Sequence, residues 1–152
     1  MFRTIAWATD GSSSARDALA VAAKLAHDNA AKIVVIHVDE LPVGQAVIAP
    51  NPNGVSAHLS GVAQELRAQG IEATVLSSSV ASGDVARGIV DLARKAGADV
   101  IIAGNSRRGV LARLLVSDVA SRLLQTAPCP VLIVPSLRKA DTPSESTVSS
   151  AA

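Results

Sequence analysis

Short runs of consecutive apolar residues recur along the chain, separated by longer segments with apolar residues at every third or fourth position. Continuous apolar runs are typical of strands covered on both faces, and spacings of three and four are typical of helices. We expect strands at residues 4–9, 32–38, 72–77, 99–103 and 131–134. Because strands that alternate with helices form parallel sheets, the pattern predicts one doubly wound α/β domain with helices on both faces.

Helices are predicted in the segments between these strands: from the serines at 12–14 to about residue 30, and at about 57–69, 85–96 and 117–125. Ser14 stands three residues before Asp17, as in a capping box. Gly70 and Gly97 suit left-handed helix ends. The strand at 72–77 alternates between apolar and polar residues, which predicts a half-buried or edge strand.

Three segments are predicted to lack regular structure. Residues 41–56 hold three prolines and two glycines, so we expect a long loop that acts as a lid or simply lies on the surface. Residues 80–84 form a shorter loop, with Asp84 as the expected N-cap of the next helix. The domain is expected to span residues 1–137, and residues 138–152, poor in large apolar groups, are expected to be a disordered tail.

Composition narrows the function classes. The chain has 152 residues, 49% of them hydrophobic but only 1% aromatic, which argues against binding single-stranded nucleic acid or a flavin by stacking. A net charge of +1 predicts neither nucleic-acid nor membrane partners. Cys129 is the single cysteine and cannot form an internal disulfide; together with the absence of a secretory signal pattern, it leads us to expect a cytoplasmic protein.

The candidate chemistry gathers where predicted strands end, since parallel sheets bind ligands at their carboxyl ends. The segment GNSRRGVLARLLVSD at residues 104–118 follows a buried strand. Its Gly104 and Gly109 flank Arg107 and Arg108, and arginines can offer forked donors to a phosphate. This segment is therefore predicted to border an anion site, although Arg107 and Arg108 can equally be solvated surface charges.

Several motifs together identify a family. They are TDGS at 9–12, HVDE at 37–40, GD at 83–84, GADVIIAG at 97–104 and APCPVLIVP at 127–135. In kind and order, the chain resembles a universal stress protein over roughly residues 3–135. The resemblance implies a five-stranded parallel sheet in the order 3-2-1-4-5 and usually a homodimer. It also implies ATP or AMP at the carboxyl edge of the sheet, with Mg²⁺ if the ligand is ATP, or no nucleotide in another branch.

The nucleotide-binding branch carries a signature of Gly, two residues, Gly, nine residues, Gly, and then Ser or Thr. This chain keeps Gly104 but has Arg107, Ser117 and Asp118 at the other three positions. A glycine lets the backbone approach a phosphate without a Cβ in the way, so Arg107 and Ser117 in place of glycine would strain the loop or push the ligand outward. A carboxylate at Asp118 would repel a polyphosphate unless Mg²⁺ lies between them.

The resemblance implies a ligand site made largely by backbone groups. The cofactor-binding residues we expect are Ala8, Thr9, Asp10, Val38, Gly104, Ser106, Arg107, Gly109, Ser117 and Asp118. Asp10 either contacts a ribose or a metal, or only caps the next helix. Val38 would lend backbone groups to an adenine ring.

No catalytic or metal-binding residue is predicted. His37 is expected to be a satisfied inner residue, His27 and His58 are expected to be exposed, and the spacing of the three does not suggest a zinc site. No group is positioned in the sequence pattern to activate water, so the protein is not expected to be an enzyme.

Two functions therefore stay open. One is a nucleotide-binding regulatory module with its ligand between the ends of the first and fourth strands. The other is a dimeric interaction protein with a vestigial site. Its last strand, from Val131 to Val134, is apolar enough to pair with another chain at an open sheet edge. Dimerisation is compatible with both functions, so ligand occupancy must separate them.

Overall fold

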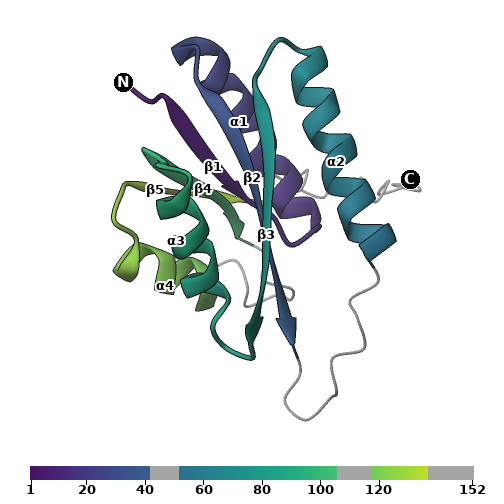
Figure 1. The fold of residues 1–152 in the computed structure, drawn as a ribbon. Coiled ribbons are helices and arrows are strands. Elements are labelled where there is room, and N and C mark those ends of the chain that lie inside the picture. The colour runs from purple at the N-terminus through teal and green to yellow at the C-terminus, as the bar shows by residue number, and fades with distance from the viewer. Residues whose placement is uncertain (42–51, 106–117, 137–152) are drawn as a thin grey trace, which may run out of the picture.

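A parallel sheet forms the centre of the computed structural model, which describes residues 1–41, 52–105 and 118–136. The described strands run in the order β3-β2-β1-β4-β5, which confirms the predicted topology (Figure 1). They are β1 (Thr4–Ala8), β2 (Lys32–Leu41), β3 (Ala73–Ala81), β4 (Val100–Asn105) and β5 (Val131–Pro135). The alternating strand β3 lies at one edge of the sheet, as predicted.

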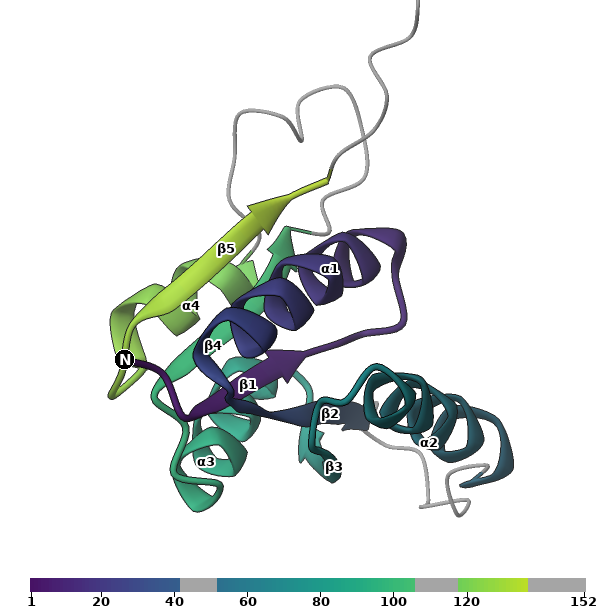
Figure 2. The ribbon, with the colours of Figure 1, turned by 90° about the horizontal axis from the view of Figure 1, so that it is seen from above.

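Two layers of helices cover the sheet (Figure 2). The helices are α1 (Ser13–Asn29), α2 (Pro52–Ala68), α3 (Val85–Lys95) and α4 (Asp118–Thr126). Because side chains alternate along a strand, β1 sends Ile5 and Trp7 toward α1 and α2, and Ala6 and Ala8 toward α3 and α4. The cores on the two faces are almost entirely aliphatic. None of the helices in the described ranges combines the length and the apolar character that a membrane span requires.

Helix α1 packs closely on the sheet because its buried stripe is made of alanines. Ala18, Ala22 and Ala26 have at most 1% of their surface exposed. The helix begins after Ser12, whose hydroxyl oxygen accepts a hydrogen bond from Ala15 N at 3.3 Å. The predicted capping box at Ser14 is therefore wrong: Ser14 lies inside the helix, where its hydroxyl contacts that of Ser12 at 2.9 Å.

Strands β2 and β3 are longer than the sequence pattern predicts. They stay paired from Ile33↔Ala73 to Leu41↔Ala81, past the point where β1 ends at Ala8 (Figure 1). The predicted strand exit at residues 39–40 and the predicted loop at 80–81 are therefore wrong. Polar side chains are compatible with these positions because each strand supplies the other with backbone hydrogen bonds there.

The remaining boundaries agree with prediction to within a few residues. Gly70 and Gly97 end their helices with φ of +80° and +66°, as expected. Asp84 lies at the N-cap of α3, but its side chain makes no capping hydrogen bond. Helix α2 begins at Pro52, so residues 52–56 are helical rather than part of the predicted loop. Proline suits a first helical turn because it has no N–H to satisfy.

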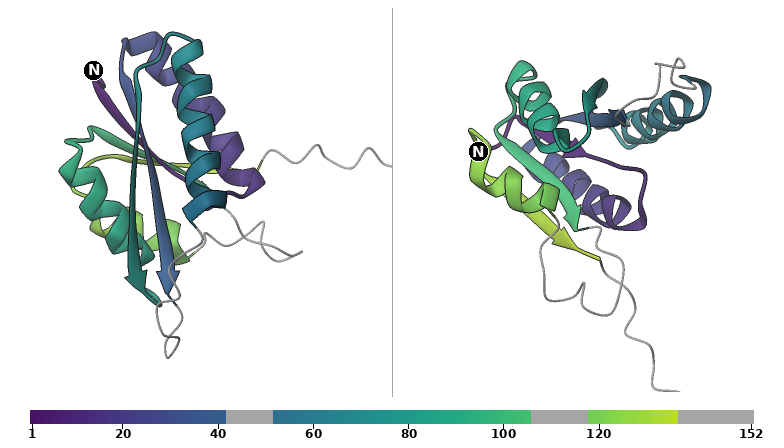
Figure 3. Two further views of the ribbon diagram at one scale, coloured as in Figure 1. Left: turned by 45° about the vertical axis from the view of Figure 1, so that its right-hand side comes forward. Right: turned by 90° about the horizontal axis from the view of Figure 1, so that it is seen from below.

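Helices α3 and α4 contact one another on one face of the sheet (Figure 3). Helix α4 buries Ala120 and Leu123, whereas Leu124, which also belongs to its apolar pattern, is 56% exposed. The predicted tail at 138–152, most of the predicted loop at 41–56 and most of the candidate anion-binding segment at 104–118 lie outside the described residues.

Candidate functional site

The carboxyl ends of β1 and β4 lie side by side at one edge of the sheet, next to β2, which continues past them. Ala8 at the end of β1 is in register with Ile36 of β2 and with Ala103 of β4. Consequently the residues just beyond these pairs, Thr9, Val38 and Gly104, lie along the same edge. The structure thus places together residues that are about 30 and 65 positions apart in the sequence, as a parallel topology requires.

The backbone N–H and C=O of Val38 lie at this edge, beyond the end of β1. The amide of Thr9 donates to the carbonyl oxygen of Ile36 at 2.9 Å, so Ile36 turns its backbone groups toward β1. Because backbone direction alternates along a strand, Val38 turns its N–H and C=O the same way, beyond the end of β1. Within the described residues, no backbone hydrogen bond joins Val38 to the segment after β1. Among the residues that the structure describes, the N–H and the C=O of Val38 thus have no backbone partner on this side.

The side chain of Val38 fixes the position of these backbone groups. It points to the opposite helical layer, where α3 has a glycine beneath it. A Cβ built on Gly88 would lie 2.9 Å from Cγ1 of Val38 and 3.0 Å from Cγ1 of Val80. Because Gly88 has no side chain, α3 packs directly against the side chain of Val38 and holds it in place.

His37 joins the ends of β1 and β2. Its Nδ1 lies 2.9 Å from the carbonyl oxygen of Thr9, and its Nε2 lies 2.9 Å from Oδ1 of Asp39. Its side chain is only 12% exposed. The carbonyl oxygen can only accept, so Nδ1 donates to it. His37 is therefore the satisfied inner residue that the sequence pattern predicts, but the link to Thr9 had no signal in the sequence.

Asp10 shapes the turn between β1 and α1. Its Oδ1 accepts a hydrogen bond from Ser12 N at 2.9 Å, and the Thr9 hydroxyl oxygen accepts one from Gly11 N at 3.1 Å. Gly11 has φ of +79°, a conformation that disfavours other residues. Asp10 is exposed, and Ser12 rather than Asp10 is the N-cap. Asp10 therefore stabilises the turn before α1 without being its N-cap, and its contact with a ribose or a metal stays a prediction.

Gly104 has a packing reason to be glycine. A Cβ on it would lie 2.3 Å from the carbonyl oxygen of Ser14 and 2.7 Å from the amide nitrogen of Ala15. Both are backbone atoms of the first turn of α1 and cannot move without moving the helix. The first position of the nucleotide signature therefore lets α1 approach β4, whatever its role toward a ligand.

The remaining site residues are only partly described. Ala8 is buried at the end of β1, with 6% of its surface exposed. Asp118 is the first residue of α4 and is exposed, and a carboxylate at this end of a helix interacts favourably with the helix dipole. Ser106, Arg107, Gly109 and Ser117 lie outside the described residues.

A second set of polar contacts joins the end of β2 to the loop that follows β3. Oε1 of Glu40 accepts hydrogen bonds from Gly83 N at 2.6 Å and from the Ser82 hydroxyl at 2.9 Å. These bonds, first that from the Gly83 amide and then that from Ser82, hold the pKa of Glu40 below its ordinary value. Arg122 of α4 donates to the carbonyl oxygen of Gly83. The loop after β3 is thus joined to both β2 and α4.

Metal and thiol chemistry find little support in the described part of the chain. No group of three His, Cys, Asp or Glu side chains converges there in a way that could hold a metal ion. Cys129 is half-buried, and burial, followed by the nearby charge of Asp99, raises the pKa of its thiol. A raised pKa lowers the thiolate fraction and hence the reactivity. His27 and His58 are exposed, as expected.

Comparison with known proteins places this fold in a family. The family model described as "Universal stress protein family" matches residues 1–135. A universal stress protein from Synechocystis sp. is 30% identical over 139 residues, covering 89% of this chain and 87% of that protein. One from Thermus aquaticus is 31% identical over 137 residues, covering 88% of this chain and 99% of that protein.

Solved structures agree with this assignment at the level of the fold. The structure of a universal stress protein from Archaeoglobus fulgidus superposes with a TM-score of 0.70 at 24% identity, covering 88% of this chain and 99% of that one. The chain described here therefore belongs to the universal stress protein family.

Proposed function

We propose that this protein is a regulatory module that binds an adenine nucleotide, ATP or AMP, between the carboxyl ends of β1 and β4. The observation that carries the proposal is the donor and acceptor pair on the backbone of Val38, which no described backbone group beyond β1 satisfies. Adenine presents an amino donor next to a ring-nitrogen acceptor, so one edge of the base can pair with both groups. This recognition uses backbone groups alone, so it needs no aromatic side chain to stack on the base in a chain with only 1% aromatic residues.

A solved relative supports the class of ligand. A universal stress protein in complex with cAMP superposes with a TM-score of 0.64 at 24% identity, covering 88% of this chain and 97% of that one. That protein binds an adenine nucleotide on the same fold, and we extend this ligand class to the present chain.

The phosphates are proposed to lie toward the segment after β4. There Arg107 and Arg108 supply positive charge, and the amides that begin α4 supply donors. Asp118 at the start of α4 disfavours a bare polyphosphate, so ATP would bind with Mg²⁺, whereas AMP needs no metal. We propose binding without hydrolysis, because the sequence motifs suggest no residue that would activate water. The single cysteine is consistent with a cytoplasmic setting.

A second candidate function is that of a dimeric interaction protein. Strand β5 lies at the edge of the sheet, and Leu132 on it is 41% exposed. Leu124 of α4, which precedes β5 in the chain, is 56% exposed. An open apolar edge strand favours pairing with a second copy of the chain. This pairing is compatible with nucleotide binding but does not require it.

Thermal unfolding with and without nucleotide separates the two functions. A ligand at about 100 times its dissociation constant adds about 2.7 kcal/mol to the free energy of unfolding. For a chain of this size, that raises the midpoint of thermal unfolding by about 5 to 10 °C. We expect such a rise with AMP, or with ATP and Mg²⁺, after bound nucleotide has been removed from the preparation, and Arg107→Ala should reduce it. No rise with any adenine nucleotide at millimolar concentration would favour the interaction protein.

A further inference from the structure

A cavity of about 350 Å³ opens between α1 and α2 on the Trp7 face of the sheet. Gly11 and Ser12 of the turn after β1 border it, but none of the residues proposed to bind the nucleotide does, so the two sites are distinct neighbours. Its volume falls in the lower part of the range of small-molecule sites. The cavity therefore has room for a single small organic molecule.

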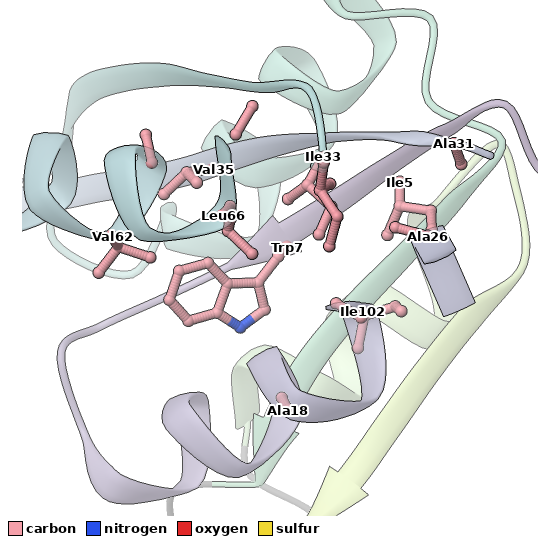
Figure 4. Packing of buried hydrophobic residues seen from close by; sticks show 14 of the residues in the cluster. Ile5, Trp7, Ala18, Ala26, Ala31, Ile33, Val35, Val62, Leu66 and Ile102 are labelled. Atoms are coloured by element: carbon pink, nitrogen blue, oxygen red, sulfur yellow. The ribbon is translucent and has the colours of Figure 1, made fainter. Parts of the chain in front are cut away.

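The floor of the cavity is apolar. Trp7, which is 3% exposed, lies between α1 and α2, close to Val62 and Leu66 in the view of Figure 4. Its indole N–H donates to the carbonyl oxygen of Ala15 at 2.9 Å, which fixes the plane of the ring. Leu19 and Val62 also border the cavity. A fixed aromatic ring flanked by aliphatic side chains suits an apolar ligand body.

The rim of the cavity carries one cation and one anion. Arg16 comes from the first turns of α1, and Glu65 comes from α2. On α2, His58, Gly61, Val62 and Glu65 follow one another at helical spacing, so one face of the helix lines the cavity. In the ranges that the structure describes, neither Arg16 nor Glu65 forms an ion pair, with the other or with a third residue. Both charges are therefore available to a ligand.

We propose that this cavity binds a small zwitterion with an apolar body, of the chemical class of a free apolar or aromatic α-amino acid. Arg16 takes the carboxylate, which its planar guanidinium can hold through two parallel hydrogen bonds. Glu65 takes the ammonium group. The apolar side chain lies against Leu19 and Val62, next to the buried indole of Trp7. A ligand with only one charge leaves either Arg16 or Glu65 without a counter-charge, so it binds less tightly than the zwitterion.

Trp7 provides the measurement. It is the single tryptophan of a chain without tyrosine, so all fluorescence excited near 295 nm comes from the cavity floor. The probes are L-phenylalanine, phenethylamine, which lacks the carboxylate, and 3-phenylpropionate, which lacks the ammonium group. We expect L-phenylalanine to change the emission with an affinity about ten times that of either analogue. No saturable change with L-phenylalanine up to 20 mM, or equal affinities for all three probes, would overturn the proposal.

Charge variants test the role of each rim residue. Arg16→Gln should weaken L-phenylalanine about tenfold and leave phenethylamine unchanged, and Glu65→Gln should weaken L-phenylalanine and leave 3-phenylpropionate unchanged. Both residues are exposed, so both variants are expected to fold. If Arg16→Gln weakens all three probes equally, the assignment of the carboxylate to Arg16 is wrong.

Gly61 allows the cavity to be filled without damage to the fold. A Cβ built on it meets nothing within 4 Å, and leucine favours a helix more than glycine does. Gly61→Leu should abolish the response to L-phenylalanine, while the thermal midpoint stays at or above that of the parent. The response of the protein to AMP should be unchanged, because the proposed nucleotide site lies elsewhere. Retained L-phenylalanine binding in Gly61→Leu would show that the amino acid binds at another place.

Discussion

Gly104 at the end of β4 lies so close to Ser14 of α1 that a Cβ on it would fall 2.3 Å from the Ser14 carbonyl oxygen. The indole of Trp7 holds the neighbouring residue of the same turn, Ala15, through a hydrogen bond of 2.9 Å. Contacts with β1 and β4 therefore fix the position of the first turn of α1, and with it the turn at residues 10–12. The position of this turn determines one wall of both proposed sites.

Replacement of Gly104 tests this close approach. Gly104→Ala should lower the free energy of unfolding by about 1 to 3 kcal/mol or more, because a methyl group must displace helix backbone. Gly61→Ala is the matched control, since a Cβ there meets nothing within 4 Å in the interior of α2. The control should raise stability by up to about 1 kcal/mol. Urea unfolding followed by circular dichroism measures both, and an equally stable Gly104→Ala would contradict the packing.

The hydrogen bond of Trp7 is the second target. Trp7→Phe keeps an aromatic ring in the core but removes the N–H that donates to Ala15, and it leaves space where the larger ring was. We expect a loss of about 1 to 3 kcal/mol in the free energy of unfolding. Circular dichroism is the readout, because the variant has no tryptophan. Phe2→Leu, a change at a partly buried residue at the edge of the same core, is the control and should cost less.

Acid should weaken the contact between the starts of β1 and β4. Oδ2 of Asp99 accepts hydrogen bonds from Arg3 N at 2.7 Å and Thr4 N at 2.9 Å. These two bonds, that from Arg3 first, hold the pKa of Asp99 below its ordinary value. Because the pKa of Asp99 is lower in the folded state, its carboxylate stabilises the folded protein at pH values above the unfolded aspartate pKa of about 4. This stabilisation is lost as the pH falls through the pKa of the folded state.

The pH dependence of the thermal midpoint checks this contribution. Between pH 6 and pH 3 the midpoint of the parent should fall further than that of Asp99→Asn, whose amide oxygen still accepts but does not titrate. Asp91→Asn makes the same change of charge at an exposed position of α3 and serves as the control. Parallel curves for the parent and Asp99→Asn would show that the bonds to Arg3 and Thr4 do not stabilise the charged form.

The edge strand β5 should mediate self-association. Leu132→Lys places a charge on this exposed edge, which disfavours pairing of two copies. Sedimentation velocity should show the parent as a dimer and Leu132→Lys as a monomer at the same concentration. Val55→Lys, at a residue of α2 that is 44% exposed, is the control and should stay dimeric. A dimeric Leu132→Lys would place the interface elsewhere.

The fold could be predicted from the sequence because its local signals agree with one another. The apolar runs, the alanine stripe of α1 and the stops at Gly70 and Gly97 all favour the same alternation of strands and helices. The grouping of Thr9, Val38 and Gly104 at one edge follows directly from that topology.

Other features depend on contacts between distant residues, and periodicity does not report such contacts. The ends of β2 and β3 are stabilised by each other and by Glu40, which accepts hydrogen bonds from residues 42 and 43 positions further along the chain. The link from His37 to Thr9 spans 28 positions. The cavity between α1 and α2 depends on the distance between two helices, so the sequence pattern alone could not indicate it.

Backbone amide NMR during a titration with AMP tests the central proposal most directly. We predict that the amide signal of Val38 shifts in a saturable way while that of Val62, on the other helical layer, stays in place. Inosine monophosphate, which has a carbonyl group in place of the adenine amino group, should bind about ten times more weakly. An unmoved Val38 amide at millimolar AMP, or equal binding of the two nucleotides, would contradict adenine recognition by the backbone of β2.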